Sequence, residues 1–301
     1  MVMIERALKS NRHMKSLTGL SIQEFMILLM SFEPILVDHF SHKTRKRKVG
    51  GGRKGALKDA QSKLFYILFY FKTYPTYDLA SFIFGVDRSQ CFHWTARFMP
   101  LLEQALGRHL VLPKRQVRSM EEFLVLCPDA RDLFIDGTER RTQRPQKSKA
   151  QRKRYSGKKK TYTRKNTLIA NEKREILFLS PTKDGRIHDL KQLKKTEILE
   201  HIPQEIALWI DKGYQGIISI LKNNNPVMMP HKKPRGKNLT SQQKQENKVI
   251  SGIGIVVEHA INGVKRFGAM SGIYRNRKGQ DDTMIYLCSG LWNFYLQYTK
   301  R

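Results

Sequence analysis

The stretch LFIDGTERRTQRP, residues 133 to 145, joins a short apolar run to a cationic segment through one carboxylate, that of Asp136. The apolar residues Leu133, Phe134 and Ile135 favour a β-strand. The Asp136-Gly137 pair that follows is typical of a turn at the end of a strand. Taken alone, this pattern favours a turn at Asp136. The alternative, that the carboxylate is half of a metal site, requires other acids in matching positions.

The same pattern occurs once more, in ALWIDKGYQG at 207–216, where Asp211 is the first charge after an apolar run. Carboxylates at the ends of two strands can meet at one edge of a sheet, and they repel each other unless a cation lies between them. Carboxylate oxygens without His or Cys partners suit Mg²⁺ or Mn²⁺. The pair of Asp136 and Asp211 therefore favours a metal site.

A third acid, Glu258, lies in the segment VEHAINGVKRF at 257–267, which we predict to be a helix. Glu258, Asn262 and Lys265 are spaced by four and then three residues, so they share the polar face of that helix. In phosphodiester chemistry a two-metal site activates the attacking oxygen and stabilises the leaving one, and a nearby Lys can hold a phosphate. Without the two Asp residues, the same segment would be interpreted as an ordinary amphipathic helix.

The chain of 301 residues is strongly basic, with 56 Lys and Arg against 26 Asp and Glu and a formal charge of +30. Such a charge predicts a polyanionic partner. The strongest apolar run, LFYILFYF at 64–71, is too short to span a membrane, and the N-terminus lacks the apolar region of a secretory signal. We therefore expect a cytoplasmic protein that is associated with DNA. Three widely separated cysteines indicate neither a zinc site nor a disulfide framework.

Residues 1–125 are predicted to form a helical DNA-binding region. Between 76 and 106, a short helix, a break at Gly85 and a longer helix that begins near Arg88 follow the layout of a helix-turn-helix. An ordinary helical hairpin is the alternative, but the basic charge favours DNA contact. Arg88 and Gln90 are then among the first residues that could reach base edges.

Residues 126–301 change to the pattern of a mixed α/β domain. Short segments rich in β-branched and aromatic residues are bounded by Gly, Pro, Asp or Asn, which is typical of strands. Helices are predicted at 188–200 and from about 241. The predicted strands lie within 132–140, 161–171, 174–182, 207–216 and 225–231.

A basic insertion separates the first two predicted strands. From Arg140 to Lys165, thirteen of 26 positions are Lys or Arg and none is an acid. Because the preceding strand carries Asp136, the insertion should emerge beside the proposed metal site and contact DNA phosphates in a salt-sensitive way. Tyr155 could stack on an unpaired base or belong to a strand, whereas we expect Tyr162 in the core.

Several segments, taken in order, resemble DDE-type transposases of bacterial insertion sequences, specifically the IS-five family, whose catalytic region is related to that of the eukaryotic Harbinger elements. The resemblance covers most of the chain and is strongest from Asp136 onward. The matching segments are IDGTERRTQRP from 135, YSGKKKTYTRKNTLI from 155, SPTKDGRIHDL from 180, IDKGYQG from 210, VEHAINGVKRF from 257 and YRNRK from 274.

The resemblance implies a ribonuclease-H-like catalytic domain in which Asp136, Asp211 and Glu258 bind two Mg²⁺ or Mn²⁺ ions. It implies binding of double-stranded DNA, both the terminal inverted repeats and the target, followed by metal-dependent hydrolysis and strand transfer. It also implies that Lys265 contacts DNA near the element's end. A homodimer on the DNA is one arrangement that we expect. Other residues expected to contact DNA are Arg88, Gln90, Arg140, Arg141, Lys158, Lys159, Lys160, Arg266, Arg275 and Arg277.

The chain departs from the family in one place. Members often carry Arg four residues before the Glu and Tyr seven before it, whereas this chain has Gly254 and Ser251, so the DNA contact of that Arg is not expected. Asp189 is a rival for the second ligand, but its position at a predicted helix start favours a capping role. Two alternatives remain: a domesticated DNA-binding protein that does not cut, and a structure-specific nuclease without strand transfer.

Overall fold

The computed structural model describes residues 2–41, 55–236, 238–276 and 279–299. The chain divides into two compact units. The first comprises Met1–Leu112, Lys265–Gly272 and Leu287–Arg301, and the second comprises Pro113–Val264 and Ile273–Tyr286. In this division the first, helical unit ends at Leu112 and also includes two C-terminal segments.

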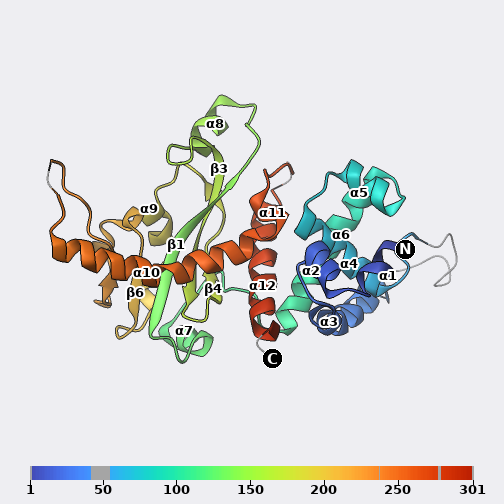
Figure 1. Ribbon diagram of the computed structural model, residues 1–301, viewed down its shortest axis with the longest axis horizontal. Helices are drawn as coiled ribbons and strands as arrows, with labels where there is room; N and C mark the ends of the chain where they lie inside the picture. The colour runs from blue at the N-terminus through green and yellow to red at the C-terminus, as the bar shows by residue number, and fades with distance from the viewer. Residues whose placement is uncertain (1, 42–54, 237, 277–278, 300–301) are drawn as a thin grey trace. The chain divides into compact units, whose positions relative to one another are not determined.

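The helical unit is built around α4, whose residues 64–71 are all buried. A helix that is apolar on every side must be surrounded by other helices, and here it is the centre of the unit (Figure 1). Asp59 begins α4 in a capping box, because its carboxylate accepts from Ser62 N at 2.7 Å. The helices are α1 (Val2–Ala7), α2 (Asn11–Thr18), α3 (Ile22–Ser41), α4 (Ala60–Thr73), α5 (Tyr77–Phe84) and α6 (Arg88–Arg108).

The predicted helix-turn-helix is confirmed in α5 and α6. Gly85 ends α5 in the left-handed conformation, with φ of 62°, which favours glycine. Asp87 then caps α6 by accepting from Ser89 N at 2.8 Å. The break between α5 and α6 lies where the sequence predicted it, because the glycine that ends α5 and the aspartate that caps α6 both act locally.

Among the described helices, none is by itself long and apolar enough to cross a membrane; only α2 and α3, taken together as a bent pair, meet that length and composition. Many of the apolar side chains of α3 are buried within the helical unit.

The second unit contains a mixed sheet, as predicted. Its strand order is β2-β3-β1-β6-β7, with β4 and β5 also paired to β3. β1 pairs antiparallel with β3 and parallel with β6. The strands are β1 (Asp132–Arg141), β2 (Tyr155–Ser156), β3 (Thr161–Asn171), β4 (Ile176–Leu179), β5 (Lys183–Asp184), β6 (Ala207–Ile210) and β7 (Val227–Met228).

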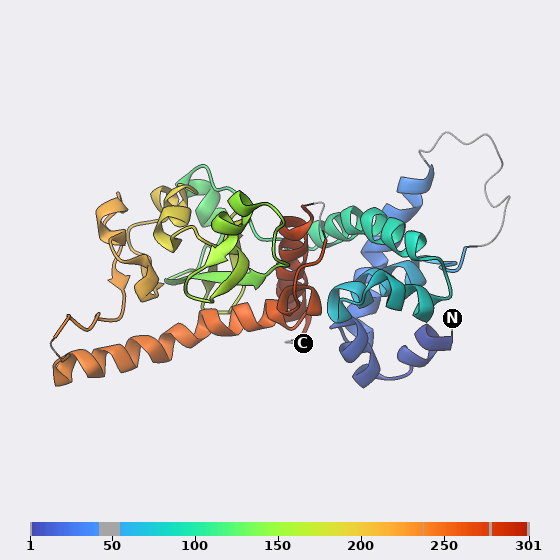
Figure 2. The same ribbon diagram turned by 90° about the horizontal axis from the view of Figure 1, so that it is seen from above.

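Helices cover both faces of this sheet. α7 (Met120–Leu126) and α9 (Asp189–Lys194) lie on one face, together with the 3-10 helix η1 (Ile198–His201), and α10 (Ser241–Lys265) runs along the opposite face (Figures 1 and 2). The remaining elements are α8 (Ser148–Arg154), the 3-10 helices η2 (Lys212–Tyr214) and η3 (Ile217–Ile220), α11 (Gly268–Ser271) and α12 (Asp281–Thr299).

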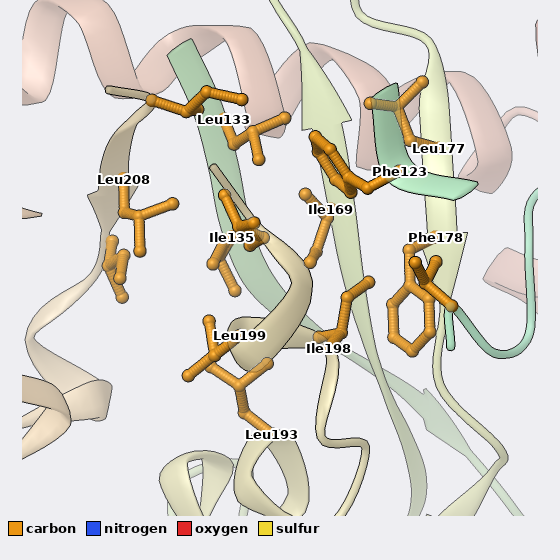
Figure 3. Close-up of a cluster of buried hydrophobic side chains, with 14 of the residues drawn as sticks. Phe123, Leu133, Ile135, Ile169, Leu177, Phe178, Leu193, Ile198, Leu199 and Leu208 are labelled. Atoms are coloured by element: carbon orange, nitrogen blue, oxygen red, sulfur yellow. The ribbon is translucent and has the colours of Figure 1, made fainter. Parts of the chain in front are cut away.

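The core of the second unit lies between the sheet and the layer of α7, α9 and η1 (Figure 3). Leu133 and Ile135 of β1 point into it beside Leu208 of β6. Because side chains alternate along a strand, Phe134 and Asp136 point to the other face, along which α10 runs. Phe134 stacks there on Trp209, with ring centroids 6.1 Å apart.

Candidate metal and nucleic-acid site

Asp136 and Asp211 are brought side by side by the register of two parallel strands. The pairing of β1 with β6 runs to Ile135 opposite Ile210, and the two acids follow directly. Neighbouring strands lie about 4.8 Å apart, so both carboxylates start from adjacent positions on one face. The strand register therefore sets the two acids next to each other. Only Asp211 follows a strand end, however, because β1 continues past Asp136 to Arg141.

The carboxylate of Asp136 is held in an environment that disfavours its charge. Burial raises its pKa to about 6, with further increases from the charges of Asp211 and Asp189, against the hydrogen bond from Gly137 N and the charge of Lys158. Gly137 N donates to Asp136 Oδ1 at 2.6 Å. Within the described parts of the chain, no basic side chain forms an ion pair with Asp136 or Asp211. A divalent cation would supply the missing positive charge.

Asp189 lies near this pair, although the sequence favoured a capping role for it over that of a ligand. The N-cap residue of α9 is His188, so Asp189 stands in the first helical turn and not at the predicted capping position. Its side chain lies next to Gly137 and Gly213. A methyl group added at Gly137 would lie 2.9 Å from Asp189 Oδ1, and one added at Gly213 would lie 3.1 Å from Asp189 Oδ2. In the sequence, Gly137 follows Asp136 directly and Gly213 follows Asp211 two residues later. In the structure these two glycines leave space for the carboxylate of Asp189.

The hydroxyl of Tyr214 lies among the same carboxylates. It is buried and makes no hydrogen bond of good geometry with the described residues. Burial raises the pKa of Tyr214 well above its ordinary value, and the charges of Asp136 and Asp189 raise it further. A methyl group at Gly137 would lie 3.5 Å from this hydroxyl oxygen. The hydroxyl is therefore a protonated donor beside the acids.

Glu258 is not gathered with the two Asp residues. α10 buries Val257, Ile261 and Val264, as the helix periodicity predicted, and leaves Glu258 exposed. Across residues 2–41, 55–236, 238–276 and 279–299, no group of three or more His, Cys, Asp or Glu side chains is close enough to hold a metal ion. Asp136 and Asp211 do lie next to each other. They suit a hard divalent cation, because both offer carboxylate oxygens and neither has an ion-pair partner among the described residues.

The basic insertion forms an extension of the β1–β3 hairpin that carries α8 and β2 (Figure 1). Lys158, Lys159 and Lys160 are exposed, and the charge of Lys158 reaches Asp136. Tyr155 is 45% exposed and meets Tyr162 edge to face at 5.9 Å. Tyr162 is only half-buried on this extension, so its predicted place in the core is wrong: the hairpin reaches beyond the layer of helices there.

Two residues that we expected to contact DNA pack against other parts of the protein. Arg140 is 6% exposed, with its guanidinium carbon 4.5 Å from the ring centre of Tyr274. Arg266 is half-buried in the helical unit, where it donates to Gly19 O at 2.9 Å and lies 3.9 Å from the ring centre of Tyr295. The sequence could not separate these packed cations from exposed ones, because both types stand in basic runs.

The other predicted contacts vary in exposure. Arg88 is exposed at the start of α6, with an ion pair to Asp78 at 3.5 Å, and Gln90 is half-buried. Arg141 is exposed, whereas Lys265 and Arg275 are half-buried. Arg277 lies outside the described residues.

Comparisons with known proteins match both the helix-turn-helix and the domain that contains the acid pair. A model of the helix-turn-helix of DDE superfamily endonuclease matches residues 55–108, and a model of DDE superfamily endonuclease matches residues 135–293. A curated protein of Microchaete diplosiphon, "Probable transposase for insertion sequence element IS702", is 29% identical over 285 residues, which is 95% of each chain. No solved structure matches.

The endonuclease match begins at Ile135, one residue before the first acid of the pair, and spans the sheet and α10. Endonucleases of this superfamily use divalent metal ions, in agreement with the oxygen donors found beside each other here. Since that match covers more than half of the chain, the protein belongs to the DDE superfamily endonuclease family, with the helix-turn-helix of that superfamily in its helical unit.

Proposed function

We propose that this protein is a DNA transposase. It binds the ends of an insertion sequence, hydrolyses phosphodiester bonds there, and joins the freed 3′-hydroxyl to target DNA. The observation that carries the proposal is the parallel register of β1 and β6, which sets Asp136 and Asp211 side by side in a domain of the DDE endonuclease family. The name of the Microchaete diplosiphon relative, a probable transposase, supports the same assignment.

We further propose Asp136, Asp211 and Glu258 as ligands of Mg²⁺ or Mn²⁺. Support for Glu258 comes from α10, which runs along the face of the sheet toward which Asp136 points (Figure 2). When bound, two such ions would activate the attacking oxygen and stabilise the leaving oxygen of an in-line displacement. The carboxylates would hold these ions, and the partial burial of Asp136 would strengthen its attraction to them.

DNA binding divides between the two units in this proposal. The helix-turn-helix recognises the terminal repeats of double-stranded DNA, with Arg88 and Gln90 at the start of its second helix. The exposed cations Lys158, Lys159 and Lys160 bind backbone phosphates near the acid pair, since the charge of Lys158 reaches Asp136. A homodimer on the DNA would bring two element ends together.

The test is a cleavage and joining assay with labelled DNA that carries the element's inverted repeat, together with a target plasmid and Mg²⁺. We expect nicked and joined products with the wild type and neither product with Asp136→Asn or Asp211→Asn, at unchanged DNA affinity. Asp129→Asn is a matched control, because Asp129 is an exposed acid of the same unit.

Three outcomes would change the assignment. A wild-type protein that nicks DNA no better than Asp136→Asn would overturn the enzyme and favour a domesticated DNA-binding protein. Nicking without joined products would favour a structure-specific nuclease. Loss of DNA binding in Asp136→Asn would contradict the separate roles of acids and cations.

A further inference from the structure

A cavity of about 570 Å³ lies in the second unit, at the edge of the sheet that β4 and β5 form. One side of it is the segment 115–118, which follows a bridge between Lys114 and Phe178 of β4. The turn between β4 and β5, the end of α9 and part of η1 form the other sides. Sites for small ligands have volumes of about 300 to 1,000 Å³. The cavity is therefore large enough for a phosphate group and the atoms attached to it.

This cavity is separate from the acid pair. Neither Asp136 nor Asp211 lines it. Two of its elements, α9 and η1, cover the face of the sheet opposite to α10, whereas Asp136 points to the face along which α10 runs (Figures 1 and 2). A ligand in the cavity would not share the site proposed for the metal ions.

The lining of the cavity is basic. Four cationic side chains line it, against the single carboxylate of Glu197; the four are Arg115, Arg118, Lys183 and Lys195. Within the described parts of the chain, Arg118, Lys183 and Lys195 form no ion pair. Glu197 is exposed and has no ion-pair partner among these residues either. Unpaired cations that surround a concave surface attract anions.

The fourth cation, Arg115, is fixed in place by the fold. It pairs with Asp282, and its Nη1 donates to Ser180 O at 3.2 Å. Asp282 also accepts from Thr182 N at 2.7 Å and from the Thr182 hydroxyl at 2.6 Å. The Arg115 side chain remains 26% exposed. Since Asp282 balances the charge of Arg115, the excess positive charge comes from the other three cations.

Those three cations come from three separate segments. Arg118 precedes α7, Lys183 begins β5, and Lys195 directly follows α9. The oxygens of a phosphate point in tetrahedral directions, so cations on several sides can contact it at once, whereas the two oxygens of a carboxylate lie in one plane. Lys binds phosphate as a point charge and Arg binds it through two donors. The arrangement therefore suits a phosphate better than a carboxylate.

We propose that this cavity is a phosphate-binding site, with Arg118, Lys183 and Lys195 as its cations. DNA is the source of phosphate to which the proposed function points, because a duplex offers phosphates along its whole length. Free pyrophosphate offers the same chemistry. The inference rests on the proposed function only for the choice of DNA. The cavity then holds a DNA strand at a place apart from both the hairpin extension and the acid pair.

The experiment uses the full chain and two probes, a fluorescein-labelled DNA duplex and inorganic pyrophosphate. Affinity is measured by fluorescence anisotropy for the duplex and by calorimetry for pyrophosphate. We expect Lys195→Ala to weaken binding by up to about 5-fold, the effect of one exposed charge contact. Lys194→Ala is the matched control with a much smaller effect, because Lys194 is exposed and precedes Lys195 but does not line the cavity.

The two probes distinguish the sources of phosphate. Weaker duplex binding in Lys195→Ala than in Lys194→Ala supports a DNA phosphate as the ligand. A difference with pyrophosphate alone supports the site but assigns it to a free phosphate. Equal effects of the two variants on both probes would overturn the proposal.

Removal of the acid tests the sign of the ligand's charge. Glu197→Gln should tighten binding of the same probe by a similar factor, because it removes the one negative charge of the lining. A loss of folding cannot imitate tighter binding. Unchanged or weaker binding in Glu197→Gln would contradict an anion in this cavity.

Failure of the underlying function would look different, because these measurements require neither a metal ion nor cleavage. A wild type that neither nicks nor joins DNA, but loses phosphate affinity in Lys195→Ala, would refute the transposase and support the cavity. Normal cleavage and joining, together with equal affinities in Lys195→Ala and Lys194→Ala, would refute the cavity alone.

Discussion

At the scale of single residues, the raised pKa of Asp136 predicts a pH-dependent effect on stability. The folded pKa is about 6, above the ordinary value of 3.8, so the folded protein binds this proton more tightly than the unfolded chain does. Stability from this group is therefore lost as the pH rises from about 4 to about 6. At pH 8 without divalent metal, we expect Asp136→Asn to raise the free energy of unfolding by up to about 3 kcal/mol, since one pKa unit is about 1.4 kcal/mol.

Urea unfolding of both proteins at pH 8 and pH 4, with a chelator present, measures this effect. The advantage of Asp136→Asn should be mostly lost near pH 4, where the carboxyl is protonated in the folded wild type and about half-protonated in the unfolded chain. Asp129→Asn should show little effect at either pH, because Asp129 is exposed. An equal advantage for Asp136→Asn at both pH values would contradict the assigned cause.

The glycines that follow the acids give a second residue-scale prediction. Gly137→Ala would set its methyl group 2.9 Å from Asp189 Oδ1, closer than side chains tolerate. We expect a loss of about 1–3 kcal/mol in the free energy of unfolding, as for other overpacked sites, together with weaker Mn²⁺ binding. Gly157→Ala is the control, because nothing lies within 4 Å of the added methyl group. Equal stability of the two variants would argue against close approach at Gly137.

At the scale of elements, the hairpin extension makes a prediction about salt. Each phosphate contact contributes about 0.9 to the slope of log affinity against log salt, so replacing Lys158, Lys159 and Lys160 together by Ala should lower that slope by about 2.7. Fluorescence anisotropy with duplex DNA between 50 and 200 mM salt measures it. Lys173→Ala, at the opposite end of β3, should leave the slope unchanged. An unchanged slope in the triple variant would remove the hairpin from the DNA interface.

The strands also show why a basic run in the sequence does not identify the residues that can contact DNA. Arg140 and Arg141 are neighbours in β1, yet one is buried against Tyr274 and the other is exposed. Strand alternation sends adjacent side chains to opposite faces, and the run of cations carries no mark of which face is covered. Only the packing partner decides which of the two can contact DNA.

At the scale of the whole molecule, the chain's C-terminal segment belongs to its N-terminal helical unit. Phe294 of α12 is fully buried there and meets the ring of His109 at 5.0 Å. We expect Phe294→Ala to destabilise this unit by about 3–5 kcal/mol, because a large buried side chain is lost. The exposed Gln297 lies one turn further along α12, and Gln297→Ala should change stability by no more than about 0.5 kcal/mol.

Limited proteolysis shows which unit is affected. In Phe294→Ala, cleavage within residues 1–112 should become faster, while residues 113–264 stay protected. Equal protection of both units in the two variants would contradict the assignment of this segment to the helical unit.

The sequence by itself determined the family and several elements, although it predicted neither α12 nor the short strands β2 and β5. The helix-turn-helix break, the five predicted strands and the apolar face of α10 follow from caps, glycine and periodicity, which act over a few residues. The endonuclease family follows from ordered motifs. Tertiary structure alone decided that Asp136 and Asp211 follow paired positions of β1 and β6, that Lys165 pairs with Asp189, and that Arg140 is buried against Tyr274. The physical reason is that strand register and burial depend on residues far apart in the chain, which local patterns do not encode.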